Sequence, residues 1–337
     1  MVKFQFRTIA VLPVLALLAG ACKEDPKTSG NANTPPFFDP AAPGAPDESP
    51  ITPAAKKKVQ MNLVTYNVWG LPWPLTVRKE RFPYISRAMI EAGISRDVAV
   101  VQFQETFTRP AREMVESLWT VPNPTWGPPA KFPKTSGGLA SAFRWKVITS
   151  FQKAFSACKG SDCLSRKGAL FTRVEIPHPI SETGQEVWFI NTHLNSEGDD
   201  SLRQKQLKQV FGWMDAAGIG ADDAIVFTGD FNYIAESFVH TWMVKEKGFT
   251  DAWDESALRY IQQGQFPPLA FTFDPFNNPN AARSEKIPQR LDYVYYRSSP
   301  TVQLKMQTIR IAMTDRVLED AQLSDHYALE TQFQIEY

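Results

Sequence analysis

Short apolar runs recur along the chain from Val59 onward and predict strands. The clearest are MNLVTYN, DVAVVQFQE, EVWFINTHL, DAIVFTGDFN and RLDYVYYR. Several are apolar almost throughout, which is typical of strands that are covered on both faces. The last residues, YALETQFQIEY, instead alternate strictly, and this alternation predicts a terminal strand with one buried face.

Helical periodicity falls between these strands. The segment after Ser201 places Leu207, Val210, Phe211 and Met214 on one face and closes at Gly218, which predicts a helix. Residues 82–92 and 238–247 predict two further helices with a less regular pattern. Strands and helices alternate without an internal repeat or a second linker, so residues 59–337 are expected to form a single α/β domain.

The first residues follow the pattern of an export signal over residues 1–21. Lys3 and Arg7 precede the apolar run 9–18, which is too short to span a bilayer, and small residues follow it. The stretch LLAGAC resembles the lipobox of bacterial lipoprotein precursors, in which the cysteine, here Cys22, is acylated and becomes the mature N-terminus. It departs from that pattern at Ala19, where Leu is usual, and a simple secretory signal is the alternative.

Residues 22–58 predict a disordered tether, because they are rich in Pro, Ala, Asn, Thr and Ser and hold few large apolar side chains. An acylated Cys22 would hold the protein on a membrane surface without crossing it. The chain is therefore expected to be exported, either as a cell-envelope lipoprotein or as a secreted protein.

The charge balance does not favour binding to a polyanion. The first 58 residues hold seven basic and five acidic residues, so the remainder holds 29 basic and 31 acidic residues. A nucleic-acid-binding domain usually has a basic surface. Cys158 and Cys163 are separated only by KGSD, with no His or further Cys beside them, so an exported protein is expected to join them in a disulfide.

Polar residues of a particular kind end the predicted strands. They supply oxygen ligands for a hard cation, two imidazoles, and carboxylates to orient them: Asn67, Glu105, His193, Asp230, Asn232, Asp292, Ser324, Asp325 and His326. Singly, each has an ordinary explanation as a turn residue, a solvated strand end or a structural histidine. Together they predict a site, because strand ends and their loops converge in layered α/β folds. The other two histidines, His178 and His240, are expected to be structural.

Six segments carry a resemblance that covers the whole globular part. In order, NLVTYNVWGLP, VVQFQETF, FINTHLNS, VFTGDFN, RLDYVYYR and LSDHYAL resemble the endonuclease/exonuclease/phosphatase superfamily of metal-dependent phosphoester hydrolases. CLSRKGALFTRVEI and FTFDPFNNPNAA are more locally similar to segments of bacterial and neutral sphingomyelinases, as is LSDHYAL. The resemblance implies a four-layer α/β sandwich of two packed, mostly antiparallel or mixed sheets flanked by helices.

The resemblance also implies a metal site and a general base. The metal ligands would be Glu105, Asn67 and Asp325, and the cofactor would be Mg²⁺, with Mn²⁺ or Co²⁺ in substitution. His326 matches the general base, whose unperturbed pKa of about 6.5 suits proton transfer near neutral pH. Asp292 matches the carboxylate that orients this imidazole.

The remaining matched residues would act on the phosphoryl group. His193 and Asn232 match donors to its oxygens, and Asp230 matches the carboxylate that orients the attacking water. Gly229 is expected to let the backbone approach a substrate phosphate closely. Asn195 remains unassigned, because a turn explains it equally well.

The predicted function is hydrolysis of a phospholipid or other phosphodiester in the manner of sphingomyelinase C. A nuclease of the same superfamily and a non-catalytic, phospholipid-binding surface lipoprotein are the alternatives; nucleic acid is the less favoured substrate, and no protein partner is inferred. Ser298–Leu323 lacks the aromatic residues that several secreted sphingomyelinases insert into membranes. Trp69 and Trp73, or Phe271, Phe273 and Phe276, could replace them or serve in packing.

Overall fold

The computed structural model describes residues 57–72, 79–177, 184–283, 286–318 and 321–337. The described residues lie within one compact unit, Ala54–Tyr337. The predicted export signal, the tether and Cys22 lie outside the described residues and remain predictions, and His178 and Trp73 lie outside them as well. No helix in the described ranges has both the length and the apolar character needed to cross a membrane.

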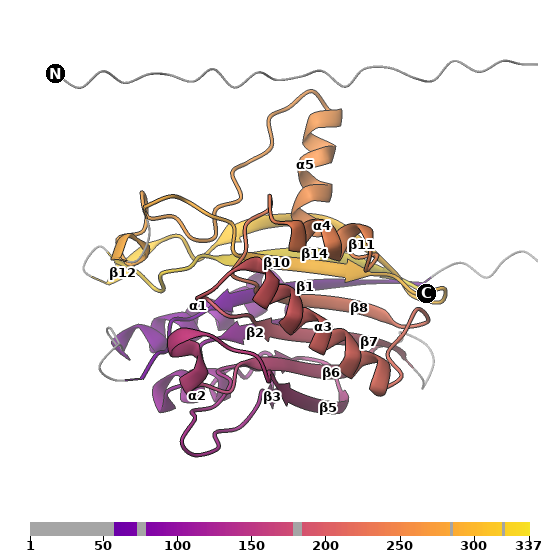
Figure 1. Ribbon diagram of the computed structural model, residues 1–337. Coiled ribbons are helices and arrows are strands. Elements are labelled where there is room, and N and C mark those ends of the chain that lie inside the picture. The colour runs from indigo at the N-terminus through magenta and orange to yellow at the C-terminus, as the bar shows by residue number, and fades with distance from the viewer. Residues whose placement is uncertain (1–56, 73–78, 178–183, 284–285, 319–320) are drawn as a thin grey trace, which may run out of the picture. The chain divides into compact units, whose positions relative to one another are not determined.

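Two sheets of six strands each form the centre of this unit (Figure 1). The first has the strand order β11-β14-β1-β2-β4-β3. Its strands are β1 (Lys58–Asn67), β2 (Val98–Gln104), β3 (Asn123–Trp126), β4 (Ala140–Phe143), β11 (Gln303–Ala312) and β14 (Ala328–Glu336). The predicted C-terminal strand is present as β14, but it lies between β11 and β1 and is buried on most of both faces rather than on one.

The second sheet has the strand order β5-β6-β7-β8-β10-β9. Its strands are β5 (Val147–Ala154), β6 (Gly168–Ile176), β7 (Gln185–His193), β8 (Ala224–Asp230), β9 (Thr250–Asp251) and β10 (Asp292–Arg297). A separate ribbon pairs β12 (Arg316–Leu318) with β13 (Ala321–Gln322). Every residue of β2 and β8 is buried, which accounts for their nearly continuous apolar sequences.

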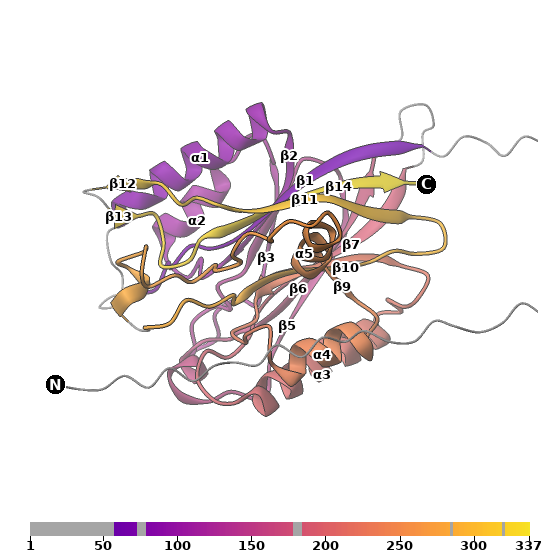
Figure 2. The same ribbon diagram turned by 90° about the horizontal axis from the view of Figure 1, so that it is seen from above.

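Helices flank both sheets, so that four layers are seen from above (Figure 2). The helices are α1 (Phe82–Ser95), α2 (Arg109–Glu116), α3 (Asp200–Ala216), α4 (Phe238–Lys245) and α5 (Ala252–Gln262), with short 3-10 turns at η1 (Lys79–Arg81), η2 (Gly160–Leu164) and η3 (Ala281–Arg283). The three predicted helices correspond to α1, α3 and α4; the patterns of α2 and α5 were too short or too polar to be recognised.

Three apolar cores match the three interfaces between these layers. Side chains such as Leu63, Phe189 and Phe333 fill the space between the sheets. A second core packs α1 and α2 against the first sheet, and a third packs α3 and α4 against the second sheet. The predicted four-layer α/β sandwich with mixed sheets is therefore confirmed, and it buries both faces of each sheet.

Strand register brings the polar strand ends to one edge of the sandwich. β1 runs parallel to β2, with Asn67 opposite Gln104. β7 runs parallel to β8, with His193 opposite Asp230. β10 is antiparallel to β8, and its first residue, Asp292, also lies opposite Asp230. β14 runs antiparallel to β1, so its start, just after His326, lies at the same edge. Six strands of the two sheets thus place polar residues at one edge.

Candidate functional site

A histidine and a carboxylate form the centre of the site. His326 Nδ1 lies 2.7 Å from Asp292 Oδ2, and both side chains are buried. His326 Nε2 lies 3.7 Å from Asp230 Oδ2. Burial lowers the pKa of His326, but the Asp292 and Asp230 carboxylates outweigh burial and raise this pKa well above its usual value. The imidazole is therefore held in a fixed orientation, with Nδ1 directed at Asp292 and Nε2 facing Asp230.

A second histidine lies on the other side of Asp230. His193 Nε2 is 3.4 Å from Asp230 Oδ2 and 3.0 Å from Lys167 Nζ. Burial and then the Lys167 charge lower the pKa of His193 to about 3, so this imidazole is neutral. Because an ammonium can only donate, Nε2 accepts from Lys167 and the proton lies on Nδ1. His193 Nδ1 is buried without a hydrogen-bond partner among the described residues.

An asparagine and two carboxylates form the oxygen-rich part of the site. Asn67 Nδ2 donates to Glu105 Oε1 at 3.2 Å and to Asp230 Oδ2 at 3.0 Å. Glu105 Oε2 is buried and has no hydrogen-bond partner among the described residues. Burial, followed by the nearby Asp325 charge, raises the pKa of Glu105 to about 7. This carboxylate is thus poorly stabilised in the absence of a positive charge beside it.

Asp325 is tied to the end of β1 through its neighbour. Ser324 Oγ donates to the Asn67 carbonyl at 2.7 Å and lies 3.2 Å from Asp325 Oδ1. Burial raises the pKa of Asp325. The donor set consists of an amide and two carboxylates with raised pKa values, one of which has the unpaired oxygen. Such a set suits a hard divalent cation such as Mg²⁺. The residues present therefore fit the predicted metal.

The backbone is strained at three positions of this edge. Trp69, Glu105 and Asn232 have φ values of 51°, 61° and 52°, in the left-handed region that non-glycine residues rarely adopt. Such conformations cost about 1–3 kcal/mol each and cluster at functional sites. The fold therefore tolerates strain where the polar strand ends meet.

The contacts of Asn232 and Gly229 differ in part from those that the sequence predicts. Asn232 Nδ2 donates to the Leu194 carbonyl at 3.1 Å, and its backbone N–H donates to Asp230 Oδ1 at 3.0 Å. Gly229 is required by the neighbouring strand, because a Cβ there would lie 2.0 Å from the Thr192 carbonyl oxygen. The expectation that Gly229 makes room for a substrate phosphate is therefore wrong, since β7 occupies that space.

Lys167 is a site residue that the sequence analysis did not single out. It is buried, contacts His193, and pairs with Asp162 Oδ1 at 2.7 Å. Asp162 lies within the loop closed by the Cys158–Cys163 disulfide, so the predicted disulfide is confirmed and its loop helps to hold the lysine. The recognisable signal was the RKGALF segment, whose lysine directly precedes β6.

Arg81 was also missed, and no sequence pattern marks it. Its guanidinium is buried and donates to the carbonyls of Val68, Trp69 and Leu323. It therefore ties the turn after Asn67 to the segment that carries Asp325 and His326. Asn195, left unassigned above, is buried and bonds to the backbone of Lys159, which indicates a structural role.

The aromatic residues considered for membrane contact do not form one group. Trp69 lies beside the guanidinium of Arg283, 5.8 Å from the ring centroid to Cζ. Phe273 is buried, with its ring centroid 5.0 Å from that of His326. Phe271 is half-buried, whereas Phe276 is exposed. Phe273 is thus part of the site, and the others lie around it.

A second histidine–carboxylate cluster joins α4, β9 and α5. His240 Nε2 is 3.0 Å from Asp251 Oδ2 and 3.2 Å from Asp254 Oδ2. Arg290 pairs with both aspartates at 3.0 and 2.9 Å. The ring of His240 also packs beside Tyr293. All members are paired, which agrees with the expectation that His240 is structural.

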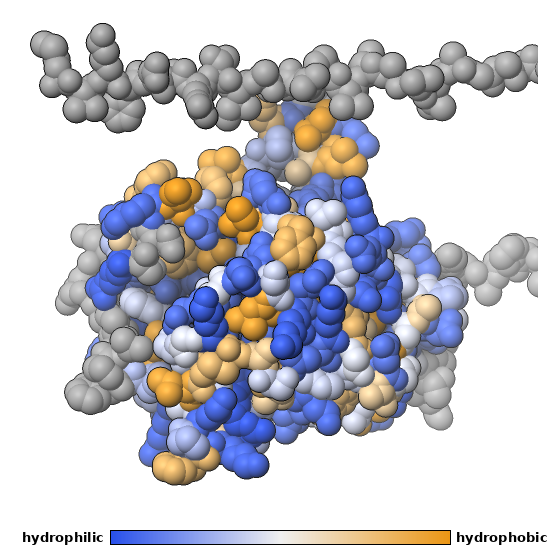
Figure 3. Space-filling view, viewed as in Figure 1, coloured by the Kyte–Doolittle hydropathy of each residue, from blue (hydrophilic) through white to orange (hydrophobic). Residues whose placement is uncertain are grey.

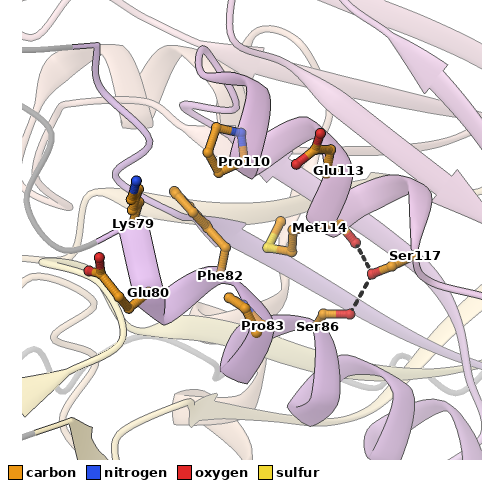
Figure 4. A pocket seen from close by; sticks show the side chains of 9 residues that line it. All are labelled: Lys79, Glu80, Phe82, Pro83, Ser86, Pro110, Glu113, Met114 and Ser117. Atoms are coloured by element: carbon orange, nitrogen blue, oxygen red, sulfur yellow. Dashed lines mark hydrogen bonds between the residues drawn. The ribbon is translucent and has the colours of Figure 1, made fainter.

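A separate concavity lies between α1 and α2 (Figure 4). It has a volume of about 460 Å³ and is lined mainly by apolar atoms, including those of Phe82, Pro83 and Met114. A hydrogen bond of 2.6 Å between Ser86 Oγ and Ser117 Oγ closes one side. None of the predicted site residues lines it, so this groove is distinct from the candidate site.

Comparison with known proteins agrees with this geometry. Residues 64–326 match the model of the Endonuclease/Exonuclease/phosphatase family, and the chain belongs to that family. Among curated proteins it is 26% identical over 268 residues to a sphingomyelinase of Mycobacterium tuberculosis, covering 75% of this chain and 48% of that protein. The match thus spans about half the length of that relative.

Two other similar proteins come from Staphylococcus aureus. A phospholipase C is 23% identical over 273 residues, covering 74% of this chain and 77% of that protein. A beta toxin crystallised with bound magnesium ions superposes with a TM-score of 0.59 at 19% identity, covering 81% of this chain and 99% of the other. The structural match supports the fold that the strand topology already shows.

Proposed function

We propose that this chain is a divalent-metal-dependent phosphodiesterase of the sphingomyelinase C type, which releases the phosphorylated headgroup of a phospholipid. The observation that carries the proposal is the convergence of His326, Asp292 and Asp230 near Glu105, whose Oε2 is buried without a hydrogen-bond partner among the described residues. The curated relatives named sphingomyelinase and phospholipase C support the same class of reaction. Residues 59–337 would form the catalytic domain.

Glu105, Asp325 and Asn67 would hold the cation, which we propose is Mg²⁺, with Mn²⁺ or Co²⁺ in substitution. The buried and unpaired Glu105 Oε2 supports this assignment. When bound, the cation would offset the charge of these carboxylates and stabilise negative charge on the phosphoryl oxygens. The similar beta toxin contains bound magnesium ions.

In its neutral form, His326 would take a proton from the attacking water at Nε2, and the positive charge of a bound cation would lower the raised pKa of this imidazole and favour that form. Asp292 supports this role, because its contact of 2.7 Å to Nδ1 fixes the tautomer and orientation of the ring. Asp230 Oδ2 lies near both imidazoles, 3.7 Å from His326 Nε2 and 3.4 Å from His193 Nε2. It would orient the water between the base and the phosphorus atom.

His193 and Asn232 would donate to the phosphoryl oxygens as negative charge develops there. The neutral His193 has a buried, unpartnered Nδ1 that is free to donate. Asn232 has a second amide hydrogen beside the one that Leu194 accepts. Lys167, 3.0 Å from His193, would add positive charge at the same side of the site.

A lipid substrate is favoured over nucleic acid by charge. Residues 59–337 hold 29 basic and 31 acidic residues, whereas phosphate-backbone binding draws on a basic surface. Export and acylation of Cys22 would place the enzyme at a membrane surface, as the N-terminal pattern predicts. Replacement of Cys22 by Ser, followed by cell fractionation and labelling with a fatty acid, tests that anchor separately from catalysis.

The direct test of function is an assay of the purified chain with Mg²⁺ and with chelator. The substrates are sphingomyelin, phosphatidylcholine, plasmid and single-stranded DNA. We expect phosphorylated headgroup release from lipid, dependent on the metal. Activity on nucleic acid alone would overturn the lipid assignment, and inactivity on every substrate would favour a phospholipid-binding lipoprotein.

A further inference from the structure

Helix α5 carries exposed apolar side chains away from the body of the domain. Its first turn is anchored, because Ala252 and Trp253 are buried and Asp251 caps the helix by accepting from the N–H of Trp253. The helix then stands outward from the sheets (Figure 1), and its eleven residues span about 16 Å at 1.5 Å per residue. Ile261, in its last turn, is 60% exposed.

The segment that returns from α5 to the body is also apolar and exposed. Phe266 is 99% exposed and Leu269 is 73% exposed. Hydrophobic residues gather over α5 and beside it in the space-filling view (Figure 3). Single exposed apolar side chains are ordinary, but several at the tip of one projecting element mark an interaction surface. We call residues 260–271 the α5 tip.

The lack of charged residues at the α5 tip indicates which kind of surface it would contact. Residues 260–273 contain no Asp, Glu, Lys, Arg or His. A tip without charge enters a bilayer interface without desolvating an ion, and aromatic and aliphatic side chains are the ones that favour that interface. With 29 basic and 31 acidic residues, the domain has no excess positive charge to attract anionic lipid. A zwitterionic lipid surface is therefore the occupant that fits.

The α5 tip is continuous with the candidate active site. The chain leaves the tip at Phe271, and the Tyr327 N–H then donates to the Thr272 carbonyl at 2.7 Å, directly beside His326. Thr272 Oγ1 accepts from the backbone N–H of Asp292 at 3.2 Å. Phe273 packs against the His326 ring. One short segment therefore joins the exposed tip to both members of the His326–Asp292 pair.

An open cavity lies between the tip and the site. Its volume is about 510 Å³, and its walls include Ile234, Phe271, Ile287, Gln289 and Arg290. Ile234 follows Asn232 by two residues, and Arg290 precedes Asp292 by two. The apolar surface thus extends from the tip to the edge of the catalytic strands.

We infer that the α5 tip inserts into the surface of a zwitterionic bilayer and thereby docks the active site on its lipid substrate. The inference deepens the proposed function and rests on it for the substrate, but the docking itself is measurable without turnover. Insertion would place Ile261, Phe266 and Leu269 at the headgroup boundary. It would bring the cavity beside Asn232 and Asp292 to the membrane.

Vesicle flotation of the full chain tests the inference. All proteins carry Cys22→Ser, so that acylation does not contribute, and chelator prevents hydrolysis of the phosphatidylcholine vesicles. Phe266→Ser combined with Leu269→Ser should lower vesicle partitioning by about tenfold for each side chain. Phe132→Ser is the matched control, because Phe132 is 98% exposed in the β3–β4 connection. That connection lies at the opposite edge of the sandwich, where β3 faces β5 and β6, whereas α5 packs against β9, β10 and β11.

A second measurement separates docking from catalysis. With Mg²⁺ present, the double variant should hydrolyse soluble bis(4-nitrophenyl) phosphate at the parental rate and vesicle lipid more slowly. If the double variant loses partitioning and the parent shows no phosphodiesterase activity, docking would be supported and the proposed function would be overturned. Docking would be overturned by a parent that does not bind vesicles, by a double variant that binds like the parent, or by an equal loss in Phe132→Ser. It would also be overturned if light scattering showed that the tip joins two copies of this chain instead.

Discussion

Two clusters each place a histidine beside two aspartates, yet they differ in how fully their atoms are paired. The ligand atoms of His326, Asp292 and Asp230, and those of His240, Asp251 and Asp254, each lie within 4.8 Å of one another. In the second cluster, Arg290 neutralises both carboxylates. In the first, Asp292 Oδ1 is buried without a partner among the described residues, as is the nearby Glu105 Oε2.

This difference separates a structural cluster from a reactive one. A buried charge network stabilises a fold only when its members are paired and hydrogen-bonded, as they are around Arg290. Unpaired buried atoms and left-handed backbone at Glu105 and Asn232 cost stability. A fold retains them where a ligand completes the site. Residue composition alone does not distinguish the two clusters, but hydrogen-bond pairing does.

Replacing His326 by alanine, with His240→Ala as the control, should produce the largest difference in turnover. His326→Ala removes the base and is expected to lower the turnover of sphingomyelin by about 10²–10⁴-fold, whereas its circular-dichroism spectrum should remain that of the parent. Asp230→Asn should have a comparable effect. The control is His240→Ala, which should keep nearly parental turnover while folded, because His240 contacts Asp251 and Asp254 and not the site. Near-parental rates in His326→Ala would refute the assignment of the base.

Replacing Arg290, in the His240 cluster, should instead produce a large loss of stability. Arg290→Leu leaves Asp251 buried without its cation, and breaking such a pair typically costs about 3–5 kcal/mol of unfolding free energy. Urea denaturation followed by fluorescence measures this loss. The exposed pair Arg109–Glu113 provides the control, since Arg109→Leu should leave the urea midpoint nearly unchanged. Equal losses in the two variants would contradict the structural role of Arg290.

The pH dependence of stability should report on the His240 cluster. Burial lowers the pKa of His240, but hydrogen bonds and charges from Asp251 and Asp254 outweigh it and raise this pKa to about 9. A raised histidine pKa contributes stability that is complete below about pH 6.5 and is lost as the pH rises through about 9.

Between about pH 6.5 and 9, the expected loss of unfolding free energy is on the order of 2 kcal/mol, after allowance for solvent screening at the half-exposed Asp254. Urea midpoints measured from pH 6 to pH 9.5 give the size of the change. His240→Gln should flatten the profile between pH 6.5 and 9. An unchanged slope in that variant would show that other groups cause the loss.

A smaller effect is expected from relief of strain at Glu105. Glu105→Gly removes both a left-handed side chain and a buried carboxylate, and it should raise the unfolding free energy by about 1 kcal/mol while abolishing activity. Glu105→Ala also removes the carboxylate but keeps a Cβ, so the difference between Glu105→Gly and Glu105→Ala isolates the backbone part. A Glu105→Gly protein that is less stable than Glu105→Ala would show that this conformation is not strained.

Much of the fold and the site could be predicted from local patterns. The fully buried strands β2 and β8 have continuous apolar sequences, and the polar residues that end them converge because parallel strands finish at one edge. Lys167 and Arg81 escaped prediction for a physical reason. Their positions depend on contacts with residues far away in the chain, such as Lys167 with His193 and Arg81 with Leu323. The pairing of His240 with Arg290 is equally invisible to local patterns.

Calorimetric titration with Mg²⁺ tests most directly the distinction between the His326 site and the paired His240 cluster. The account predicts that the parent protein binds Mg²⁺, that Glu105→Gln removes this binding, and that Asp254→Asn in the paired cluster leaves it unchanged. Binding should also stabilise the parent by about 2.7 kcal/mol at a hundredfold excess over the dissociation constant. Retention of Mg²⁺ binding in Glu105→Gln, or its loss in Asp254→Asn, would contradict this assignment.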